Sequence, residues 1–146
     1  MQVRRAGPSD AEVIADVFIP SFESLTFLPR IHSHDQDRAF IRRLFADHEV
    51  WVAEDEGEVV GFAALTADML THIYVHPDAQ GRGAGSALMD QAEERRPAGF
   101  TFWVFQANES ARRFYEARGC QLLELTDGSG NEEKTPDALY EWRPAG

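Results

Sequence analysis

The chain has 146 residues, with 14 Lys and Arg against 25 Asp and Glu, so its formal net charge is −11 at pH 7. This length suits one domain with its own core, and 43% hydrophobic with 27% charged residues is a globular composition. The acidic excess argues against a nucleic-acid partner, because phosphate backbones bind patches of Lys and Arg. No run approaches the roughly 18 apolar residues of a membrane span, and the polar start carries no secretory signal. We therefore expect a single cytoplasmic domain over residues 1–146, with no membrane partner.

The one cysteine and the one lysine exclude two kinds of site. Cys120 cannot form an internal disulfide and has no His-rich spacing nearby, so we predict a buried apolar thiol and no metal site. Lys134 lies away from the glycine-rich segment, which excludes a Gly-x-x-x-x-Gly-Lys phosphate loop. His32 and His34 lack a third ligand in register, so we interpret them as part of a polar loop.

The first half of the chain predicts two helices and a run of strands. The first helix opens with a capping box of Ser9 and Glu12 and stops at Pro20. Residues 21–35 have no regular period, and the second helix begins at Asp35. The strands are expected over residues 2–6, 50–54, 58–66 and 69–75, with a hairpin turn at 55–57.

Strands and helices alternate in the second half. Ala84, Leu88 and Ala92 repeat every four residues, which indicates a helix that ends at Pro97 and Gly99. The remaining elements are a buried strand over 100–105, a helix over 108–118, strands over 121–125 and 138–142, and a polar loop over 126–136. Hairpins followed by this alternation predict a mixed sheet with helices on its faces, in the α/β or α+β class.

A glycine-rich segment lies between a predicted strand and a helix. Glycines there let the backbone approach a ligand closely, and the free N–H groups of a first helical turn bind a pyrophosphate. Arg82 adds a positive charge, while a plain glycine-rich loop is the alternative interpretation. A dinucleotide fingerprint fails because Ser86 replaces its third glycine and the segment does not follow the first strand. The segment is Gln80-Gly81-Arg82-Gly83-Ala84-Gly85-Ser86.

Two motifs resemble the GNAT superfamily of N-acetyltransferases. Ile73-Tyr74-Val75-His76-Pro77 followed by Gln80-x-x-Gly83-x-Gly85 is similar to the acetyl-coenzyme A motif [QR]-x-x-G-x-[GA] of that family. Asn108, with Tyr115 seven residues later and Gly119 before the next strand, is similar to its second motif. The resemblance covers nearly the whole chain and implies a mostly antiparallel central sheet flanked by helices.

The resemblance also implies roles for these residues. The backbone of Ile73, Tyr74 and Val75 would run beside the pantetheine arm, and one of its N–H groups would polarise the thioester carbonyl. Gly81 to Ser86 would hold the pyrophosphate, with Gln80 opening the motif. Asn108 would contact the pantetheine arm, and Tyr115 would act as general acid for the leaving thiolate. An ordinary N-cap for Asn108 and core packing for Tyr115 are the alternatives.

The general base is ambiguous in the sequence. His72 is the nearest candidate, because a period of two places it on one strand face with Leu70 and Tyr74. A surface or hydrogen-bonded histidine is the alternative, and His76 lies just beyond in a turn. Protein N-terminal acetyltransferases commonly carry a glutamate on the strand before the asparagine, where this chain has only Phe102, Trp103, Val104 and Phe105. That departure favours a small amine as acceptor.

The acceptor site has three candidate residues. Phe22 and Phe27, with Leu25 between them, line an acceptor pocket or belong to the core. The loop containing Glu132 and Glu133 presents a carboxylate to a cationic acceptor or is simply solvated. We expect an acetyl-CoA-dependent transfer to a primary amine of a small molecule, without metal. A coenzyme A-binding module without turnover is the alternative, and a homodimer is one arrangement that the sequence allows.

Overall fold

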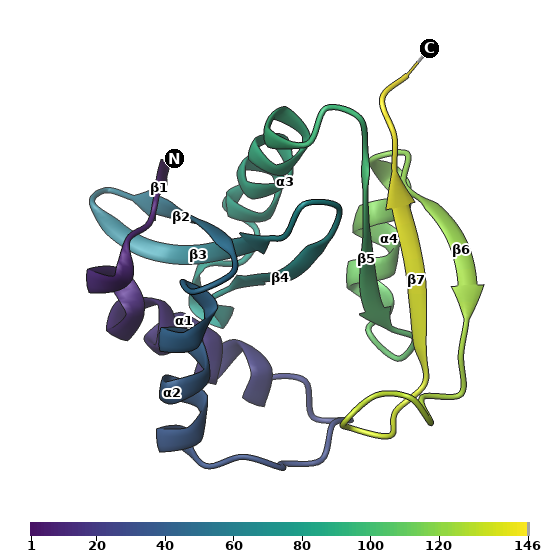
Figure 1. Ribbon diagram of the computed structural model, residues 1–146, viewed down its shortest axis with the longest axis horizontal. Coiled ribbons are helices and arrows are strands. Elements are labelled where there is room, and N and C mark those ends of the chain that lie inside the picture. Colours follow the sequence, from purple (N-terminus) through teal and green to yellow (C-terminus); the bar gives the residue numbers. More distant parts are fainter. Residues whose placement is uncertain (146) are drawn as a thin grey trace.

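The computed structural model describes residues 1–145, whose strands form two antiparallel sheets, in the orders β1-β2-β3-β4 and β5-β7-β6 (Figure 1). The strands are β1 Gln2–Arg5, β2 Glu49–Asp55, β3 Glu58–Leu65, β4 Leu70–Val75, β5 Phe100–Phe105, β6 Gln121–Leu125 and β7 Asp137–Trp142. The helices are α1 Ala11–Glu23, α2 His34–Leu44, α3 Ala84–Arg95 and α4 Glu109–Ala117, with 3-10 turns η1 Pro8–Asp10 and η2 Pro77–Ala79. The expected α+β class with mostly antiparallel strands flanked by helices is confirmed, whereas the single central sheet that was expected is divided into two.

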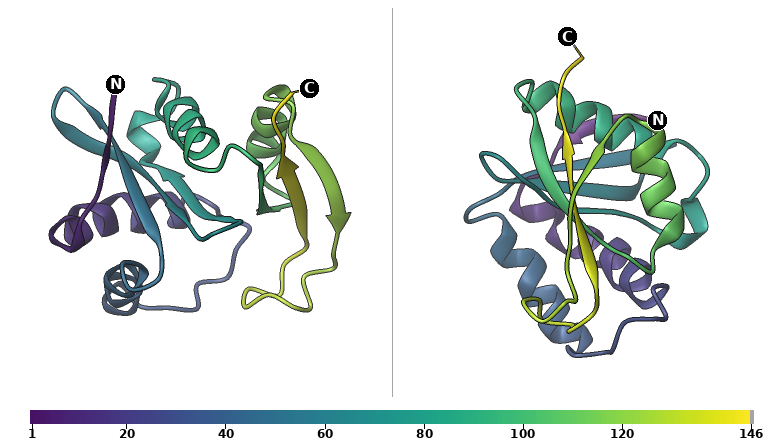
Figure 2. Two further views of the ribbon diagram at one scale, coloured as in Figure 1. Left: turned by 45° about the horizontal axis from the view of Figure 1, so that its top comes forward. Right: turned by 90° about the vertical axis from the view of Figure 1, so that its right-hand side faces the viewer.

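The two sheets touch at one end and diverge from there. Met69 forms a parallel bridge with Thr101, whose N–H donates to the carbonyl of Asp68 at 3.1 Å. Beyond this bridge β4 pairs with β3 and β5 pairs with β7. Figure 2 shows the two sheets diverging from this bridge, and within residues 1–145 β4 and β5 form no further strand pairing with each other.

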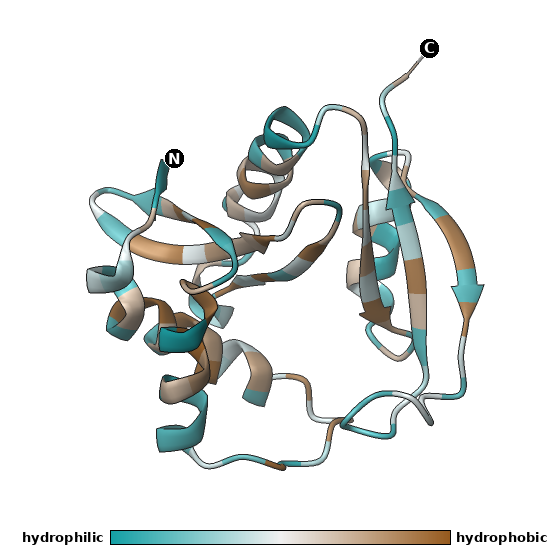
Figure 3. Cartoon of the chain, viewed as in Figure 1, coloured by the Kyte–Doolittle hydropathy of each residue, from teal (hydrophilic) through white to brown (hydrophobic). Residues whose placement is uncertain are grey.

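Helices cover both faces of the first sheet and one face of the second. Helices α1 and α2 pack together, and α1 lies on β3 and β4. Helix α3 packs on β2, β3 and β4 from the other face. Side chains alternate along β3, so Phe62 and Ala64 face α1 while Ala63 and Leu65 face α3. Apolar residues accordingly gather on the strands and on α1, while α2 shows its hydrophilic side (Figure 3).

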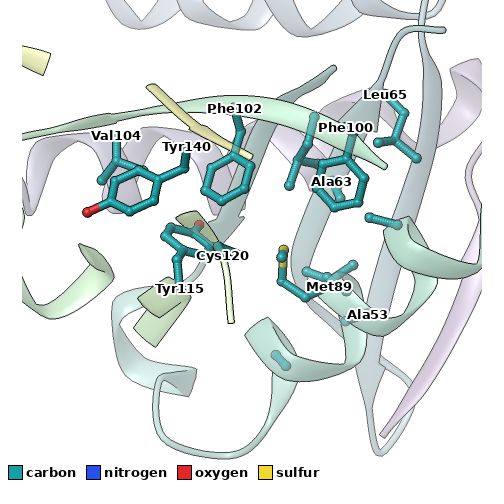
Figure 4. Packing of buried hydrophobic residues seen from close by; sticks show 14 of the residues in the cluster. Ala53, Ala63, Leu65, Met89, Phe100, Phe102, Val104, Tyr115, Cys120 and Tyr140 are labelled. Atoms are coloured by element: carbon teal, nitrogen blue, oxygen red, sulfur yellow. The ribbon is translucent and has the colours of Figure 1, made fainter. Parts of the chain in front are cut away.

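The core beside α3 extends to the second sheet and α4. Tyr115 of α4 packs its ring on Phe102 at 4.6 Å between centroids, and Phe102 stacks on Tyr140 of β7 (Figure 4). Cys120 is buried in the same cluster, and burial raises the pKa of its thiol to about 11. The prediction of a buried apolar thiol is thus confirmed.

Two predictions about α1 are wrong. Pro20 lies inside the helix and does not end it. A proline has no N–H, so the carbonyl of Asp16, four residues earlier, loses its helical hydrogen bond. Asp16 lies on the exposed side of α1, where water can bind that carbonyl. The expected capping box of Ser9 and Glu12 does not form. The carboxylate of Asp10 instead accepts the N–H of Gly7 at 2.9 Å, and η1 precedes the helix.

The other boundaries agree with prediction to within one or two residues. The turn between β2 and β3 has positive φ at Glu56 and Gly57, as a tight hairpin requires. Within residues 1–145 no helix is long and apolar enough to cross a membrane.

Candidate functional site

The glycine-rich segment forms an open helix N-terminus. Gly81 and Gly83 have φ of +82° and +93°, and Gly83 is the N-cap of α3. The first backbone bond of the helix runs from the N–H of Ala87 to the carbonyl of Gly83. Across the described chain, the N–H groups of residues 83–86 find no protein acceptor. These donors and the helix dipole fit the pyrophosphate of coenzyme A.

Two side chains of this segment point elsewhere. The guanidinium of Arg82 pairs with Asp55 at 3.3 Å and donates to the carbonyl of Asp78 at 3.1 Å. The amide of Gln80 donates to the carbonyl of Val75 at 3.5 Å. The donors aimed at an anion here are therefore backbone groups. Arg82 holds the loop against the β2–β3 hairpin.

Strand β4 presents backbone donors to the gap between the sheets. The N–H of His76 bonds to the carbonyl of Val60 on β3 at 2.8 Å. Hydrogen bonding alternates along an antiparallel strand, so Tyr74 also faces β3, while the N–H groups of Ile73 and Val75 point to the open edge. The Val75 carbonyl is bound by the hydroxyl of Ser21 at 2.8 Å. These are the donors that an extended pantetheine arm, the ligand predicted for Ile73 to Val75, would need.

A small cavity of about 90 Å³ lies in the gap, between β4, β5 and α4. Tyr115 and Asn108 line it together with Ile73. The Tyr115 side chain is only 7% exposed, and in the described part of the chain its hydroxyl has no hydrogen-bond partner. Burial, and then the nearby Tyr74, raise the pKa of Tyr115, so the phenol keeps its proton at neutral pH. It is placed to donate a proton into the gap.

Asn108 has the capping role that was the alternative interpretation, and its contact with a pantetheine arm stays a prediction. Its Oδ1 accepts the N–H of Ala111 at 3.3 Å, which makes it the N-cap of α4. Its side chain also lines the small cavity.

The prediction that His72 shares one face of β4 with both Leu70 and Tyr74 holds only for Tyr74. A β-bulge falls between His72 and Leu70, where Ala64 pairs with His72 but Leu65 pairs with Leu70. The bulge places Leu70 in the core beside α3, and it leaves His72 with Tyr74 on the side of α1 and α2. The prediction that His72 shares a face with Leu70 is therefore wrong, whereas the prediction that it shares a face with Tyr74 is confirmed.

The His72 ring is enclosed by aromatic rings. It lies edge-on to Phe40 of α2, with centroids 5.2 Å apart, and 6.3 Å from the ring of His48. Burial, reinforced by His48, lowers the pKa of His72 to about 4, so the imidazole is neutral at pH 7. His48 in turn bonds to the Asp47 carboxylate at 2.6 Å.

A cavity of about 940 Å³ lies on the α1–α2 side of the gap. It shares six lining residues with the small cavity, so the two meet between β4 and β5. Its walls are aromatic and its rim is charged, with Phe22, Arg30, Asp37, Phe40, Arg43, His72, Tyr74, Trp103, Phe105, Glu132 and Glu133 among the lining residues. A wall and rim of this kind fit a polar organic molecule.

Two loops close the far side of this cavity. The Nε2 of His32, in the loop after α1, lies 2.5 Å from the carboxylate of Glu132, in the loop before β7. Phe27 packs its ring against Phe105 at 6.0 Å. Phe22 lines the large cavity, Leu25 lines the small one, and Phe27 lies behind Phe105.

The loop over residues 126–136 is held in one shape by its own side chains. The amide of Asn131 donates to the carbonyl of Thr135 at 2.7 Å and to Asp137 at 3.1 Å. Gly128 has φ of +82°, and a Cβ there would lie 2.3 Å from the Thr135 carbonyl. Thr126 and Asp137 are also hydrogen-bonded. The predicted polar loop is thus an ordered wall that carries Glu132 and Glu133.

The remaining histidines have local partners. His34 lies 3.5 Å from Glu23, and Nδ1 of His76 accepts the N–H of Asp78 at 3.1 Å. No group of three metal-ligating side chains is present within residues 1–145.

Sequence reasoning missed several residues of the large cavity. Phe40 and Arg43 were not considered as site residues, and Trp103 was expected in a buried strand but is 45% exposed. Asp37, Phe40 and Arg43 follow each other at intervals of three residues on α2, and this spacing was a usable signal.

The chain matches the family model described as "Acetyltransferase (GNAT) domain" over residues 46–120. An uncharacterized N-acetyltransferase from Archaeoglobus fulgidus is 30% identical over 148 residues, covering 90% of this chain and 100% of the relative. The peptidyl-lysine N-acetyltransferase YiaC of Escherichia coli is 31% identical over 98 residues, covering 66% of this chain and 65% of that protein.

Other relatives differ in the acceptor that their names state. The L-amino acid N-acyltransferase MnaT of Escherichia coli is 30% identical over 135 residues, covering 82% of this chain and 78% of that protein. The crystal structure of a GCN5-related N-acetyltransferase from Rhodopseudomonas palustris superposes with a TM-score of 0.80 at 26% identity, covering 98% of this chain and 95% of that one.

Proposed function

The chain belongs to the GNAT family of acetyl-CoA-dependent N-acetyltransferases, and we propose that it acetylates the primary amine of a small molecule in a ternary complex. The observation that supports a small acceptor is the cavity of about 940 Å³, bounded on one side by two loops and continuous with the gap between β4 and β5. The acceptor would enter from the α1–α2 side and the acetyl donor from the α3–α4 side.

Backbone groups would position the donor. The N–H groups of residues 83–86 would hold the pyrophosphate, and the open edge of β4 would bind the pantetheine arm beside Asn108. An N–H of Ile73 or Val75 would donate to the thioester oxygen, where negative charge develops as the amine attacks. No covalent enzyme intermediate is required.

Tyr115 would complete the transfer as general acid. As the amine nitrogen bonds to the carbonyl carbon, the carbon–sulfur bond breaks and its electron pair goes to sulfur. The Tyr115 hydroxyl, held protonated by burial, would give its proton to that sulfur and recover one from solvent. The products are the N-acetyl amine and free coenzyme A.

His72 would accept the proton that the attacking amine loses. Its ring lines both cavities and is uncharged at neutral pH, so a nitrogen lone pair is free to accept. A pKa of about 4 makes it a weak base, and we expect it to pass the proton on to water in the large cavity. Phe22 would pack against the acceptor, and the Glu133 carboxylate would attract its ammonium group.

Turnover with a panel of amines tests this function. The protein is incubated with acetyl-CoA and amino acids, polyamines or lysine-containing peptides, and both coenzyme A release and the acetylated product are measured. We expect at least one small amine to be acetylated well above the hydrolytic background. Binding of acetyl-CoA without product in any reaction would identify a silent binding module. A clear preference for peptides would overturn the small-molecule acceptor.

A further inference from the structure

We infer that Arg43 binds an anionic group of the acceptor, so that the preferred acceptors are amines that also carry a carboxylate. The inference rests on the proposed function, because it assigns a substrate class to the same cavity. Three observations support it: the state of the Arg43 guanidinium, its place on α2, and the distribution of charge around the cavity.

In the described part of the chain, the Arg43 guanidinium has no ion pair, hydrogen bond or aromatic ring partner. The other arginine that lines the cavity, Arg30, lies 3.1 Å from Glu23 and 3.7 Å from Asp37. Elsewhere each arginine is in an ion pair, except Arg112, which donates to the Tyr140 hydroxyl, and Arg5, which lies over the ring of Trp51. In a chain with 25 acidic residues, a guanidinium left without a carboxylate beside an aromatic cavity is available to a ligand.

The position of Arg43 brings it near the reacting centre. It lies on α2 three residues after Phe40, and residues three apart on a helix are neighbours. Phe40 contacts the His72 ring, and His72 lines the passage between the two cavities. An acceptor whose amine reaches this passage can therefore extend an anionic group toward Arg43 while it remains in the cavity.

Two acidic groups lie in another part of the cavity wall, whereas Asp37, on the same helix as Arg43, is paired with Arg30 at 3.7 Å. Glu132 and Glu133 come from the loop before β7, and Glu133 lies near enough to Tyr74 to add to the effect of burial in raising the pKa of that phenol. The wall thus offers a carboxylate for the ammonium group and a guanidinium for a carboxylate. A molecule with both charges matches the two partners, whereas a diamine places a second cation beside Arg43.

The test compares α-amino acids with their amides, which keep the same amine and side chain but lose the carboxylate. The measured quantity is the ratio of kcat/KM for the acid to kcat/KM for the amide, in wild type and in Arg43→Gln. Comparing this ratio between proteins cancels the difference in amine pKa between acid and amide. We expect the ratio to fall at least tenfold in Arg43→Gln, which would correspond to about 1.4 kcal/mol, and to fall further in Arg43→Glu.

Arg42→Gln is the matched control. Arg42 directly precedes Arg43, pairs with Glu12 at 3.0 Å and does not line the cavity. The substitution Arg42→Gln therefore removes the same charge from the same helix but leaves the cavity wall unchanged. Its ratio should equal that of wild type. An unchanged ratio in Arg43→Gln, or an equal fall in Arg42→Gln, would overturn the assignment.

Binding separates this inference from the proposed turnover. Calorimetry with the protein saturated in coenzyme A measures the affinity for each acid and amide without any reaction. Carboxylate-dependent binding that Arg43→Gln abolishes, with no turnover, would support the Arg43 site and contradict the enzyme. Turnover of amines with no preference for the carboxylate would support the enzyme and overturn the Arg43 site. Failure of every amino acid to bind or react would also overturn it.

Discussion

The two sides of the gap between β4 and β5 present different kinds of groups to a ligand: backbone donors on one side and side chains on the other. On the α3–α4 side the groups aimed at a ligand are mostly backbone donors, from residues 83–86 and from the open edge of β4. On the α1–α2 side they are side chains from α1, α2, β5 and the loop over 126–136. A backbone site binds what all family members share, whereas a side-chain site can change its acceptor without changing the fold.

This difference is tested most strongly at Tyr115, the side chain on which the donor side depends. Tyr115→Phe keeps the ring packed on Phe102 but removes the proton donor, so kcat should fall roughly 10²-fold while the affinity for acetyl-CoA changes little. Steady-state kinetics and calorimetry measure the two quantities. A kcat equal to wild type would leave Tyr115 with a packing role alone.

The backbone character of the donor side is tested at Gly83. With φ of +93°, Gly83→Val strains the N-cap of α3 and turns its N–H groups away from the pyrophosphate. The affinity for acetyl-CoA should fall at least tenfold, roughly 1.4 kcal/mol. Gly119→Val, also at positive φ but at the far end of α4, controls for strain alone. An equal loss of acetyl-CoA affinity in both variants would contradict the assignment of the residue 83–86 N–H groups to the pyrophosphate.

The boundary between the two sides is tested at His72. His72→Phe keeps an aromatic ring beside Phe40 but removes the proton acceptor, so kcat should fall about tenfold, a small effect for a base because the base is weak. Unchanged activity would assign the proton to water alone.

The same variant has a pH signature in stability. With a pKa of about 4 when folded and 6.5 when unfolded, His72 binds protons preferentially in the unfolded state between these values. Wild type should therefore lose stability as the pH falls from 6.5 to 4, and His72→Phe should lose less. Denaturant melts at pH 7 and pH 4.5 measure this difference.

The smallest expected effect tests the acceptor side through its loop. Gly128→Ala forces Thr135 to move and shifts the wall that carries Glu132 and Glu133. KM for the acceptor should rise roughly fivefold, about 1 kcal/mol, while KM for acetyl-CoA stays constant. Gly130→Ala, in the same loop with open space at its Cβ, is the control. A rise in both KM values would show a general loss of structure.

The glycine-rich start of α3 could be located from the sequence for a physical reason. A backbone cradle needs glycines with positive φ at fixed spacing, so Gly81 and Gly83 mark it directly. Periodicity likewise locates the strands and helices to within two residues. The prediction that the first helix stops at Pro20 was wrong, because a helix tolerates a proline where the carbonyl left unpaired faces solvent.

The acceptor side escapes sequence reasoning because its residues meet only in three dimensions. The β-bulge before His72 changes which face its neighbours share, and no turn signal marks it. Arg43 is an ordinary surface residue of an amphipathic helix until the fold brings it into the wall of the same cavity as Trp103 and Glu133. The loop over 126–136 is polar in sequence, and only the bonds of Asn131 show that it is rigid.

The junction of the two cavities has a consequence for inhibitor design. Because the two cavities share Thr71, His72 and Tyr74 of β4 and residues 103–105 of β5, one molecule can occupy both. Coenzyme A joined through its sulfur to an amino acid by a short linker would make the second binding event intramolecular, at an effective concentration in the millimolar range. Such a bisubstrate ligand would exceed the affinity of either half, and the amino acid it carries would decide which family members it inhibits.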